Sequence, residues 1–408
     1  MQYLSVLHHC FIAILWPIER ERRKNNMTVI KNGNIISMEK GVFHGDLAYE
    51  GNKIVCISDS AIESDTAIDV HGLNVSAGYI DLHMHGGFGF DFFSVESTEE
   101  AKEALRRNAL DGVTSVMPTV TGRPSYSAEQ LKRFDYYYET MKETEGAECL
   151  GVHIEGPYFP ESQAPLHITV EPDQEQLDMI VNNYPVIKRV SLAPELPGAP
   201  EAIRFLQDHG IATAIGHSEA SSKDVEAAIK NGCKQVLHMY SGMGGIFRDE
   251  MSIRHPGLIE LAYLYDELAV ELIANGKHCD ETLLKLLYKI KGPDGIFIVT
   301  DSHKRDFSLR GDKSQYVLTN LKEDGKYHFD SAMPVKEMLR ILTQEVGVSL
   351  YDAIKMASYT PARVMGLENR KGDLKEGMDA DIVVFDDDFN IKLVIARGKT
   401  ILNELEGE

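Results

Sequence analysis

The sequence predicts an α/β protein: a (β/α)8 barrel of the TIM type with a small β-sandwich domain built from both termini. Eight apolar runs with the length of buried strands alternate with amphipathic helical patterns through the middle of the chain. Both ends of the chain instead contain short strands separated by turns rich in Gly and Asn. Polar side chains end several of the apolar runs, as they do at the C-terminal rim of a barrel.

The overall composition is that of a folded globular protein. The chain has 408 residues, of which 43% are hydrophobic and 26% charged. Its formal net charge of −21 argues against a nucleic-acid partner, because phosphate binding requires clustered Lys and Arg. The five cysteines are scattered without a CxxC pair, which fits reduced thiols in the cytoplasm rather than a disulfide framework.

Residues 1–26 form a segment that we expect to be a leader outside the fold. The apolar run Cys10 to Trp16 is too short for a membrane span. The charge cluster Glu19 to Lys24 follows that run, whereas the positive charges of a signal peptide precede it. A membrane anchor is the less favoured alternative, so we expect no membrane partner. Met27 begins the first strand-like segment.

The small domain is predicted to combine residues 27–77 with residues 372–408. Its expected strands are Thr28–Ile36, Gly45–Tyr49, Lys53–Ser58, Ala380–Asp386 and Leu393–Arg397. The dipeptides Asn32-Gly33 and Gly51-Asn52 are predicted to be turns between strands.

The barrel is predicted to span residues 78–371. Its eight strands are expected at Tyr79–His83, Thr114–Val120, Cys149–Glu155, Ile187–Ala193, Ile211–His217, Gln235–His238, Leu268–Ala274 and Ile296–Asp301. Helices are expected at Glu99–Leu110, Ala128–Lys142, Gln174–Asn182, Ala199–His209, Ser221–Asn231, Glu281–Lys289, Pro334–Val346 and Leu350–Ala357. An open doubly wound sheet is the alternative, but no Gly-rich phosphate fingerprint follows the early strands.

Five of the predicted strands end in His or carboxylate side chains. These are His83 and His85 on the first strand, Glu155 on the third, His217 on the fifth, His238 on the sixth and Asp301 on the eighth. Alternation along a strand points His83 and His85 to the same side. A single His at a strand end is more often a hydrogen-bonding group than a ligand, but packing alone does not explain this convergence. Imidazole and carboxylate ligands suit Zn, Fe, Mn or Co.

This set of side chains favours metal-assisted hydrolysis of an amide. A divalent metal with an open coordination position lowers the pKa of bound water to about 7 and polarises a carbonyl. Asp301 can take a proton from the water and return it to a leaving amine. A serine nucleophile has little support, because the chain lacks a GxSxG elbow.

Longer motifs surround the same residues. They are Ser76–Gly87 (SAGYIDLHMHGG), Gly151–Pro157 (GVHIEGP), Leu192–Glu195 (LAPE), Gly216–Ser218 (GHS), His238–Tyr240 (HMY), Arg254–Gly257 (RHPG), Glu271–His278 (ELIANGKH), Thr300-Asp301 and Gly372–Asp381 (GDLKEGMDAD). With these motifs, residues 27 to about 405 resemble the N-acetylglucosamine-6-phosphate deacetylase family within the amidohydrolase superfamily. The resemblance implies the barrel and the small domain. It also implies hydrolysis of N-acetylglucosamine 6-phosphate to glucosamine 6-phosphate and acetate.

The resemblance assigns roles to the strand-end residues. It implies that Glu155, His217 and His238 bind the principal metal, with Asp301 as general base and acid. Some members hold a second metal through an HxH pair, here His83 and His85, whereas others use one metal. We therefore expect one or two divalent ions per subunit, with zinc favoured and iron, manganese or cobalt as alternatives.

The resemblance also implies contacts with a phosphorylated amino sugar. The corresponding positions are Leu166, His167, Ser241, Gly242, Arg254 and His278. In the family, the phosphate-binding Arg and His can come from the neighbouring subunit, which implies a homodimer. Arg suits a phosphate because its planar fork makes paired, charge-assisted hydrogen bonds. The alternatives are a surface His in a polar loop for His167 and a solvated loop charge for Arg254.

The chain departs from the family around the substrate pocket. Ser241-Gly242 stands where the family usually has Asn-Ala, and the stretches Ser302–Arg305 and His328–Pro334 also differ. The cations His303, Lys304 and Arg305 can contact an anion or belong to a solvated loop. A second hypothesis is therefore an amidohydrolase for another N-acyl amino sugar or a cyclic amide. Cyclic amides are disfavoured because Glu155 replaces the bridging carboxylated Lys. A third hypothesis, a non-catalytic sugar-phosphate sensor, conflicts with an intact Asp301.

Overall fold

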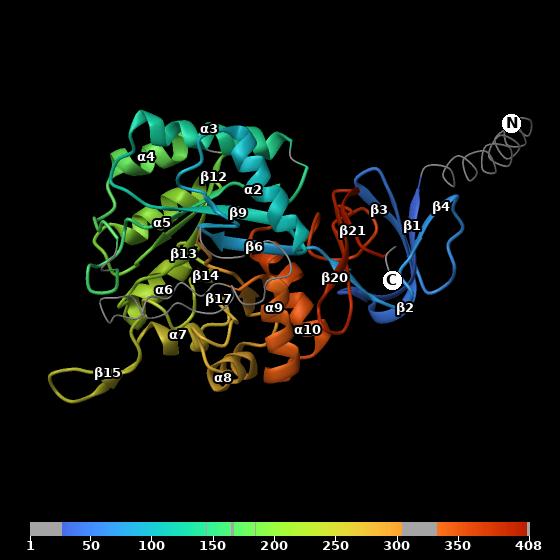
Figure 1. Cartoon of the computed structure of the whole chain (residues 1–408). Coiled ribbons are helices and arrows are strands. Elements are labelled where there is room, and N and C mark those ends of the chain that lie inside the picture. The colour runs from blue at the N-terminus through green and yellow to red at the C-terminus, as the bar shows by residue number, and fades with distance from the viewer. Residues whose placement is uncertain (1–26, 144, 165–166, 184, 304–332, 406–408) are drawn as a thin grey trace, which may run out of the picture.

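The computed structural model describes residues 27–143, 145–164, 167–183, 185–303 and 333–405. The expectations for residues 1–26 lie outside these ranges. Figure 1 shows a body of strands and helices, with a separate β-rich part where the blue N-terminal strands and the red C-terminal strands lie side by side. Across the part of the chain that the structure describes, no helix is both long enough and apolar enough to cross a membrane.

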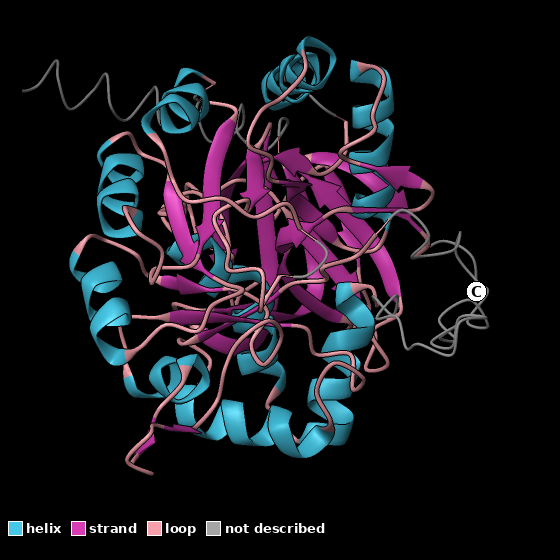
Figure 2. Cartoon of the chain, turned by 90° about the vertical axis from the view of Figure 1, so that its left-hand side faces the viewer, coloured by secondary structure: helices cyan, strands magenta, loops and turns pink. Residues whose placement is uncertain are grey.

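The body is a parallel barrel of eight strands. These are β6 (Tyr79–Met84), β9 (Val113–Thr121), β11 (Val152–Glu155), β12 (Ile187–Leu192), β13 (Ala212–Ile215), β14 (Gln235–Val236), β17 (Ala269–Leu272) and β18 (Ile296–Ile298). Figure 2 shows the strands at the centre with helices around the outside. The predicted fold class is confirmed.

Backbone hydrogen bonds close the barrel between its first and last strands. Asp301 N donates to His83 O at 2.9 Å, and His85 N donates to Ser302 O at 2.8 Å. The chain immediately after β18 therefore lies against the end of β6. This closure brings His83, His85 and Asp301 to the same place on the rim.

The third barrel strand is interrupted, which corrects the prediction of one continuous strand at Cys149–Glu155. The structure has a short β10 (Glu148–Cys149), which pairs with β9, and then β11. Gly151, between them, has φ +109°, and a Cβ there would lie 2.7 Å from Val186 O. The backbone turns at Gly151 because only glycine adopts this conformation so close to a neighbouring strand.

The helices lie near their predicted positions. They are α2 (Thr98–Leu110), α3 (Ala128–Lys142), α4 (Gln174–Asn182), α5 (Ala199–Asp208), α6 (Ser222–Lys230), α8 (Glu281–Lys291), then α9 (Val335–Arg340) continued by η2 (Ile341–Val346), and α10 (Leu350–Ile354) continued by η3 (Lys355–Tyr359) and α11 (Thr360–Val364). The sequence analysis missed α7 (Leu258–Leu264) and the hairpin of β15 (Phe247–Arg248) and β16 (Arg254–His255). Both are too short to show a clear periodicity.

The second sheet is made from both ends of the chain. Its order is β21 (Lys399–Asn403), β20 (Ile391–Ala396), β19 (Ile382–Phe385), β5 (Asn74–Ala77), β1 (Thr28–Ser37), β2 (Gly41–Glu50) and β3 (Lys53–Ser58), with β4 (Thr66–Asp69) also paired to β1. The antiparallel pair β19 and β5 joins the two ends. We propose that residues 27–77 and 372–408 form a small domain, because this sheet has an apolar core of its own.

One predicted turn in this sheet is wrong. Asn32-Gly33 lies inside β1, where the register with β2 shifts between Ile30 and Gly33. Asn32 has φ +57°, and its N–H donates to Asp46 Oδ1 at 3.0 Å. The dipeptide supplies a left-handed residue for a β-bulge instead of a hairpin turn.

A buried ion cluster connects the C-terminal segment with the barrel. Lys371 is almost fully buried, and its Nζ lies 2.7 Å from Glu148 Oε2 on β10 and 3.3 Å from Asp379 Oδ2. It also contacts Asp381. Although burial opposes its charge, these carboxylates raise the pKa of Lys371. Burial also disfavours the charged forms of Glu148 and Asp379, yet the neighbouring cations lower the pKa of both.

Candidate metal centre and active site

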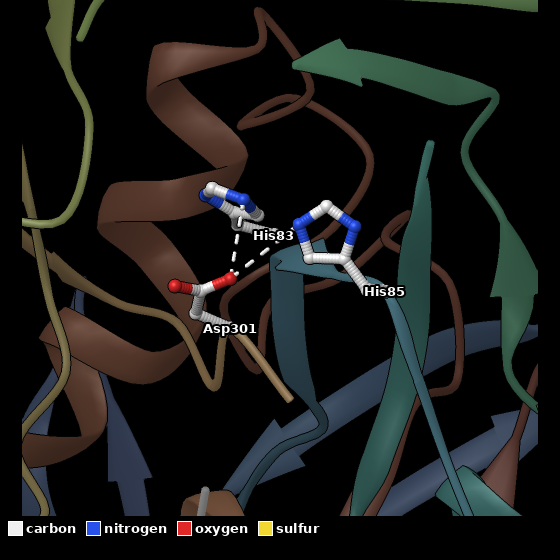
Figure 3. A group of neighbouring side chains, drawn as sticks. All are labelled: His83, His85 and Asp301. Atoms are coloured by element: carbon white, nitrogen blue, oxygen red, sulfur yellow. Dashed lines mark ion pairs between the residues drawn. The ribbon is translucent and has the colours of Figure 1, made fainter. Parts of the chain in front are cut away.

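Six predicted side chains converge on the rim of the barrel. The ligand atoms of His83, His85 and Asp301 lie within 4.8 Å of one another, and so do those of Glu155, His217 and His238. We call these the first-strand group (His83, His85, Asp301) and the Glu155 group (Glu155, His217, His238). Figure 3 shows the first-strand group, with the Asp301 carboxylate facing both imidazoles.

Glu155 also contacts the first-strand group. Its Oε1 is 3.3 Å from His217 Nε2 and 3.2 Å from His238 Nε2, whereas its Oε2 is 3.0 Å from His85 Nε2. The side chain is only 5% exposed. Burial opposes ionisation of Glu155, but the facing imidazoles lower its pKa well below the usual value. This buried carboxylate would suit a cation held among these imidazoles.

The first-strand group contains a ring nitrogen with no hydrogen-bond partner among the described residues. His83 Nε2 is fully buried and lies 3.4 Å from Asp301 Oδ1 and 3.6 Å from Glu155 Oε1. Burial disfavours the imidazolium, but the negative charges of Glu271, Asp301 and Glu155 raise the pKa of His83 well above its usual value. A buried nitrogen aimed between two carboxylates suits a cation. Both donor sets therefore fit a divalent metal.

Backbone carbonyls orient the histidines of the Glu155 group. His217 Nδ1 donates to Gln163 O at 2.9 Å, and His238 Nδ1 donates to Ser241 O at 3.2 Å. Each ring therefore presents Nε2 to Glu155, in the way that metal-binding histidines are usually held. His217 and Asp301 have φ +47° and +48°, the left-handed conformation that non-glycine residues rarely adopt. Strain of this kind clusters at functional sites.

Two further carboxylates support the rim. Glu195 accepts from Ser218 Oγ at 2.7 Å and from Glu219 N at 2.6 Å, and so fixes the loop after His217. Asp81 accepts from His83 N at 3.1 Å and from Thr300 Oγ1 at 2.5 Å. Burial raises the pKa of Asp81 to about 7.

A profile described as the amidohydrolase family matches residues 74–401, most of the chain. The chain belongs to the amidohydrolase family.

Relatives of this amidohydrolase include named deacetylases. It is 29% identical over 412 residues to the N-acetylglucosamine-6-phosphate deacetylase of Vibrio furnissii, covering 97% of this chain and 95% of the relative. It is also 29% identical over 332 residues to the N-acetylgalactosamine-6-phosphate deacetylase of Escherichia coli O157:H7, covering 79% and 86%. The crystal structure of N-acetylglucosamine-6-phosphate deacetylase from Pasteurella multocida matches with a TM-score of 0.81 and 26% identity, covering 92% of this chain and all of that one.

Two of the predicted substrate-contact residues lie near the rim: His167 beside His217, and His278 within electrostatic range of Asp301. The His167 ring is centred 4.9 Å from the His217 ring, and burial lowers the pKa of His167. His278 Nδ1 accepts from Asn275 Nδ2 at 2.9 Å, because Asn275 Oδ1 already accepts from the backbone N–H of Lys277 and His278. In the neutral imidazole, Nε2 of His278 then carries the hydrogen, which makes it a donor.

The other named substrate residues have different surroundings. Ser241 and Gly242 lie against the histidines of the Glu155 group, and a Cβ on Gly242 would lie 2.5 Å from His217 Nδ1. Arg254 does not join the cluster; it is exposed on the hairpin that projects from the barrel in Figure 1. Leu166 lies outside the described residues.

The departures that follow Asp301 have partly structural roles. Ser302 is buried, and its Oγ donates to Gly86 O at 2.6 Å. The His303 ring stacks on His85, with centroids 4.9 Å apart and an interplanar angle of 6°. Lys304, Arg305 and residues 328–332 lie outside the described part of the chain.

Sequence reasoning missed several buried polar residues beneath the rim. Glu271 and Arg189 are fully buried, with Arg189 Nη1 2.5 Å from Glu271 Oε1. Despite burial, Arg189 and His83 hold the pKa of Glu271 at about 2. His153 lies between Thr119 and Ser191, and burial lowers its pKa well below the usual value. A charged residue inside an apolar strand pattern was the available signal, because such a charge needs a buried partner.

Proposed function

We propose that this amidohydrolase removes the N-acetyl group of N-acetylglucosamine 6-phosphate by hydrolysis, giving glucosamine 6-phosphate and acetate. The observation that carries the proposal is the Glu155 group lying beside Asp301 on one rim. The similarity to deacetylases over nearly the whole chain supports the choice of substrate. We favour zinc as the ion, bound first by the Glu155 group, with a second ion at the first-strand group.

Asp301 is the group that moves the proton in this proposal. A divalent cation held by these residues supplies Lewis acidity, which polarises the amide carbonyl and makes water more acidic. Asp301 takes a proton as the water oxygen bonds to the carbonyl carbon, and returns it to the nitrogen as the C–N bond breaks. The Asp301 side chain is 20% exposed, compared with 5% for Glu155. Of the two carboxylates, Asp301 is therefore the one that substrate can reach.

His167 and His278 are the proposed contacts to the substrate from the same subunit. His167 lies beside His217, where it can donate to the acetyl oxygen. His278 offers its Nε2–H to an oxygen of the sugar phosphate, because its Nδ1 is occupied by Asn275. These donors fix the substrate without taking part in the proton transfer.

We propose a homodimer in which Arg254 reaches the phosphate bound by the partner. The hairpin that carries Arg254 exposes Ile246 (63%), Phe247 (47%), Met251 (79%) and Ile253 (52%). Apolar side chains gathered on a projecting hairpin are typical of an interaction surface. Size measurement in solution tests this assembly, and a monomer that retains full phosphate selectivity would contradict it.

The second candidate is deacetylation of a different phosphorylated amino sugar. The relative from Escherichia coli O157:H7, named for N-acetylgalactosamine 6-phosphate, has the same 29% identity as the Vibrio furnissii relative. Ser241-Gly242 also departs from the family pattern beside His238. The test must therefore distinguish N-acetylglucosamine 6-phosphate from N-acetylgalactosamine 6-phosphate as substrate.

The experiment is a turnover screen on the metal-loaded protein. Acetate release is measured with N-acetylglucosamine and N-acetylgalactosamine, each with and without a 6-phosphate. We expect the highest kcat/KM for N-acetylglucosamine 6-phosphate. Faster turnover of the galactosamine epimer would select the second candidate, and no acetate from any of the four would refute both.

We also propose a cytoplasmic location. Cys56, Cys149, Cys233 and Cys279, the cysteines within the described residues, are all free thiols. Free thiols of this kind are typical of a reducing compartment. Fractionation of the native cells would test the proposal, and recovery with the secreted fraction would contradict it.

A further inference from the structure

A single buried carboxylate beneath the rim touches both candidate metal-binding groups. Glu271 Oε2 accepts from His83 Nδ1 at 2.9 Å and from the backbone N–H of His238 at 2.9 Å. His83 belongs to the first-strand group and His238 to the Glu155 group. One side-chain oxygen of Glu271, on β17, is therefore hydrogen-bonded to a residue of each group.

Arg189 supplies the positive charge that offsets the buried carboxylate of Glu271. Both side chains have 0% exposure, and Arg189 Nη1 lies 2.5 Å from Glu271 Oε1. The same Nη1 donates to Leu82 O at 3.2 Å, the carbonyl of the residue that precedes His83. Arg189 therefore contacts both Glu271 and the strand that carries His83. Buried charges persist only when they are paired and hydrogen-bonded.

The direction of the hydrogen bond determines which nitrogen of His83 faces the centre. An ionised carboxylate only accepts, so the hydrogen lies on His83 Nδ1. In the neutral ring the lone pair is then on Nε2, which lies between Asp301 Oδ1 and Glu155 Oε1. Within the described chain this Nε2 makes no hydrogen bond, and it faces the two carboxylates.

We propose that Glu271, backed by Arg189, is a positioning residue of the metal centre: it orients His83 as a ligand and ties it to His238. The two groups are thereby held at a fixed separation by a residue that touches neither substrate nor metal. Partners that lie behind metal-binding histidines typically contribute about 10- to 100-fold in metal affinity. This inference rests on the proposed metal-dependent function.

The test compares zinc binding by variants of the whole chain. Glu271→Gln alone leaves Arg189 buried without a counter-charge, and this variant can fail to fold. The main variant is therefore Glu271→Met with Arg189→Met, because Met cannot accept the hydrogen bond of His83, and replacing both members of a buried pair by apolar residues is often neutral for stability. Arg189→Met alone is the matched control, because it keeps the carboxylate on His83; it leaves Glu271 buried without its counter-charge, so the wild type is a second reference. Zinc affinity is measured by competition with a chelator, and folding by thermal melting of the metal-free proteins.

We expect the double variant to fold and to bind zinc about 10- to 100-fold more weakly than Arg189→Met. Adding His83→Asn should then weaken binding less in the double variant than in Arg189→Met, because Glu271 acts through His83. Wild-type zinc affinity in a folded double variant, or an undiminished effect of His83→Asn, would overturn the inference. Because these measurements use zinc alone, a wrong assignment of the substrate would leave them unchanged.

Discussion

Replacing Asp301 by Asn removes the proposed proton carrier while preserving its shape. Asp301 Oδ1 faces His83 Nε2 at 3.4 Å and His85 Nε2 at 3.6 Å, and the side chain is partly exposed. The Asn side chain has the same size and fits this position. Unlike the carboxylate, its neutral amide cannot accept a proton from water. The Glu155 group is untouched, so at least one ion should stay bound.

The expected loss follows from the role assigned to Asp301. A positioned general base contributes typically about 10²- to 10⁴-fold in rate. At 1.36 kcal/mol for each factor of ten, this corresponds to about 3–5 kcal/mol of transition-state stabilisation. The loss should appear in kcat, because Asp301 acts on the reacting water and not on the sugar.

The assay measures acetate release with the metal content of each protein determined in parallel. Asp280→Asn is the matched control: Asp280 caps α8 at the same end of the barrel, where its Oδ1 accepts from Leu283 N at 2.9 Å. Asn caps a helix as well as Asp does, so this variant should keep wild-type kcat. Metal-loaded Asp301→Asn with kcat within tenfold of wild type would refute the assignment of Asp301.

Three further predictions concern the metal, the rim and the ion cluster. Dialysis against a chelator should abolish turnover and lower the Tm. The Tm should fall because an ion at about 1,000 times its Kd adds about 4 kcal/mol to the free energy of unfolding. An unchanged Tm would contradict metal binding. Gly242 has φ +57°, and Gly242→Ala places a Cβ 2.5 Å from His217 Nδ1, so this variant should lower kcat about 10²-fold. In the control Gly244→Ala the new Cβ meets nothing within 4 Å, and kcat should not change. Equal kcat values for the two variants would refute the steric argument. Lys371→Met should cost about 3–5 kcal/mol in denaturant unfolding, whereas the exposed control Lys375→Met should leave the unfolding midpoint nearly unchanged. The pKa values of Glu148 and Asp379 are lowered, so their contribution to stability is present above about pH 4.5 and is lost as the pH falls. The stability of Lys371→Met should therefore change less on acidification.

Sequence reasoning located the strand-end residues because strand period and barrel topology determine where such side chains go. His83 and His85 alternate on one strand, and Glu155 ends an apolar run before Gly and Pro. Parallel strands end at one rim, so residues far apart in sequence were expected to meet there. The sequence did not predict the buried polar residues beneath the rim. Glu271 and Arg189 lie inside strands, and their pairing depends on which side chains face each other across the barrel interior, which no local pattern records.

Local errors came from residues whose conformation depends on neighbouring strands. Asn32-Gly33 has the composition of a hairpin turn, yet the pairing with β2 continues on both sides and leaves only a bulge. Gly151 looked like part of a strand, but the proximity of Val186 O required a positive φ. In each case the local sequence allows two conformations, and contacts from a distant segment decide between them.

Barrel closure and assembly of the metal centre depend on the same contacts. The seam between β6 and the end of β18 is made by Asp301 N with His83 O and by His85 N with Ser302 O. The residues that close the barrel are therefore those of the first-strand group, or their immediate neighbours. His83, His85 and Asp301 would hold an ion across a seam that the backbone already forms. It follows that metal bound there should protect the backbone amides of His85 and Asp301 from hydrogen exchange, whereas an ion bound only by the Glu155 group should not.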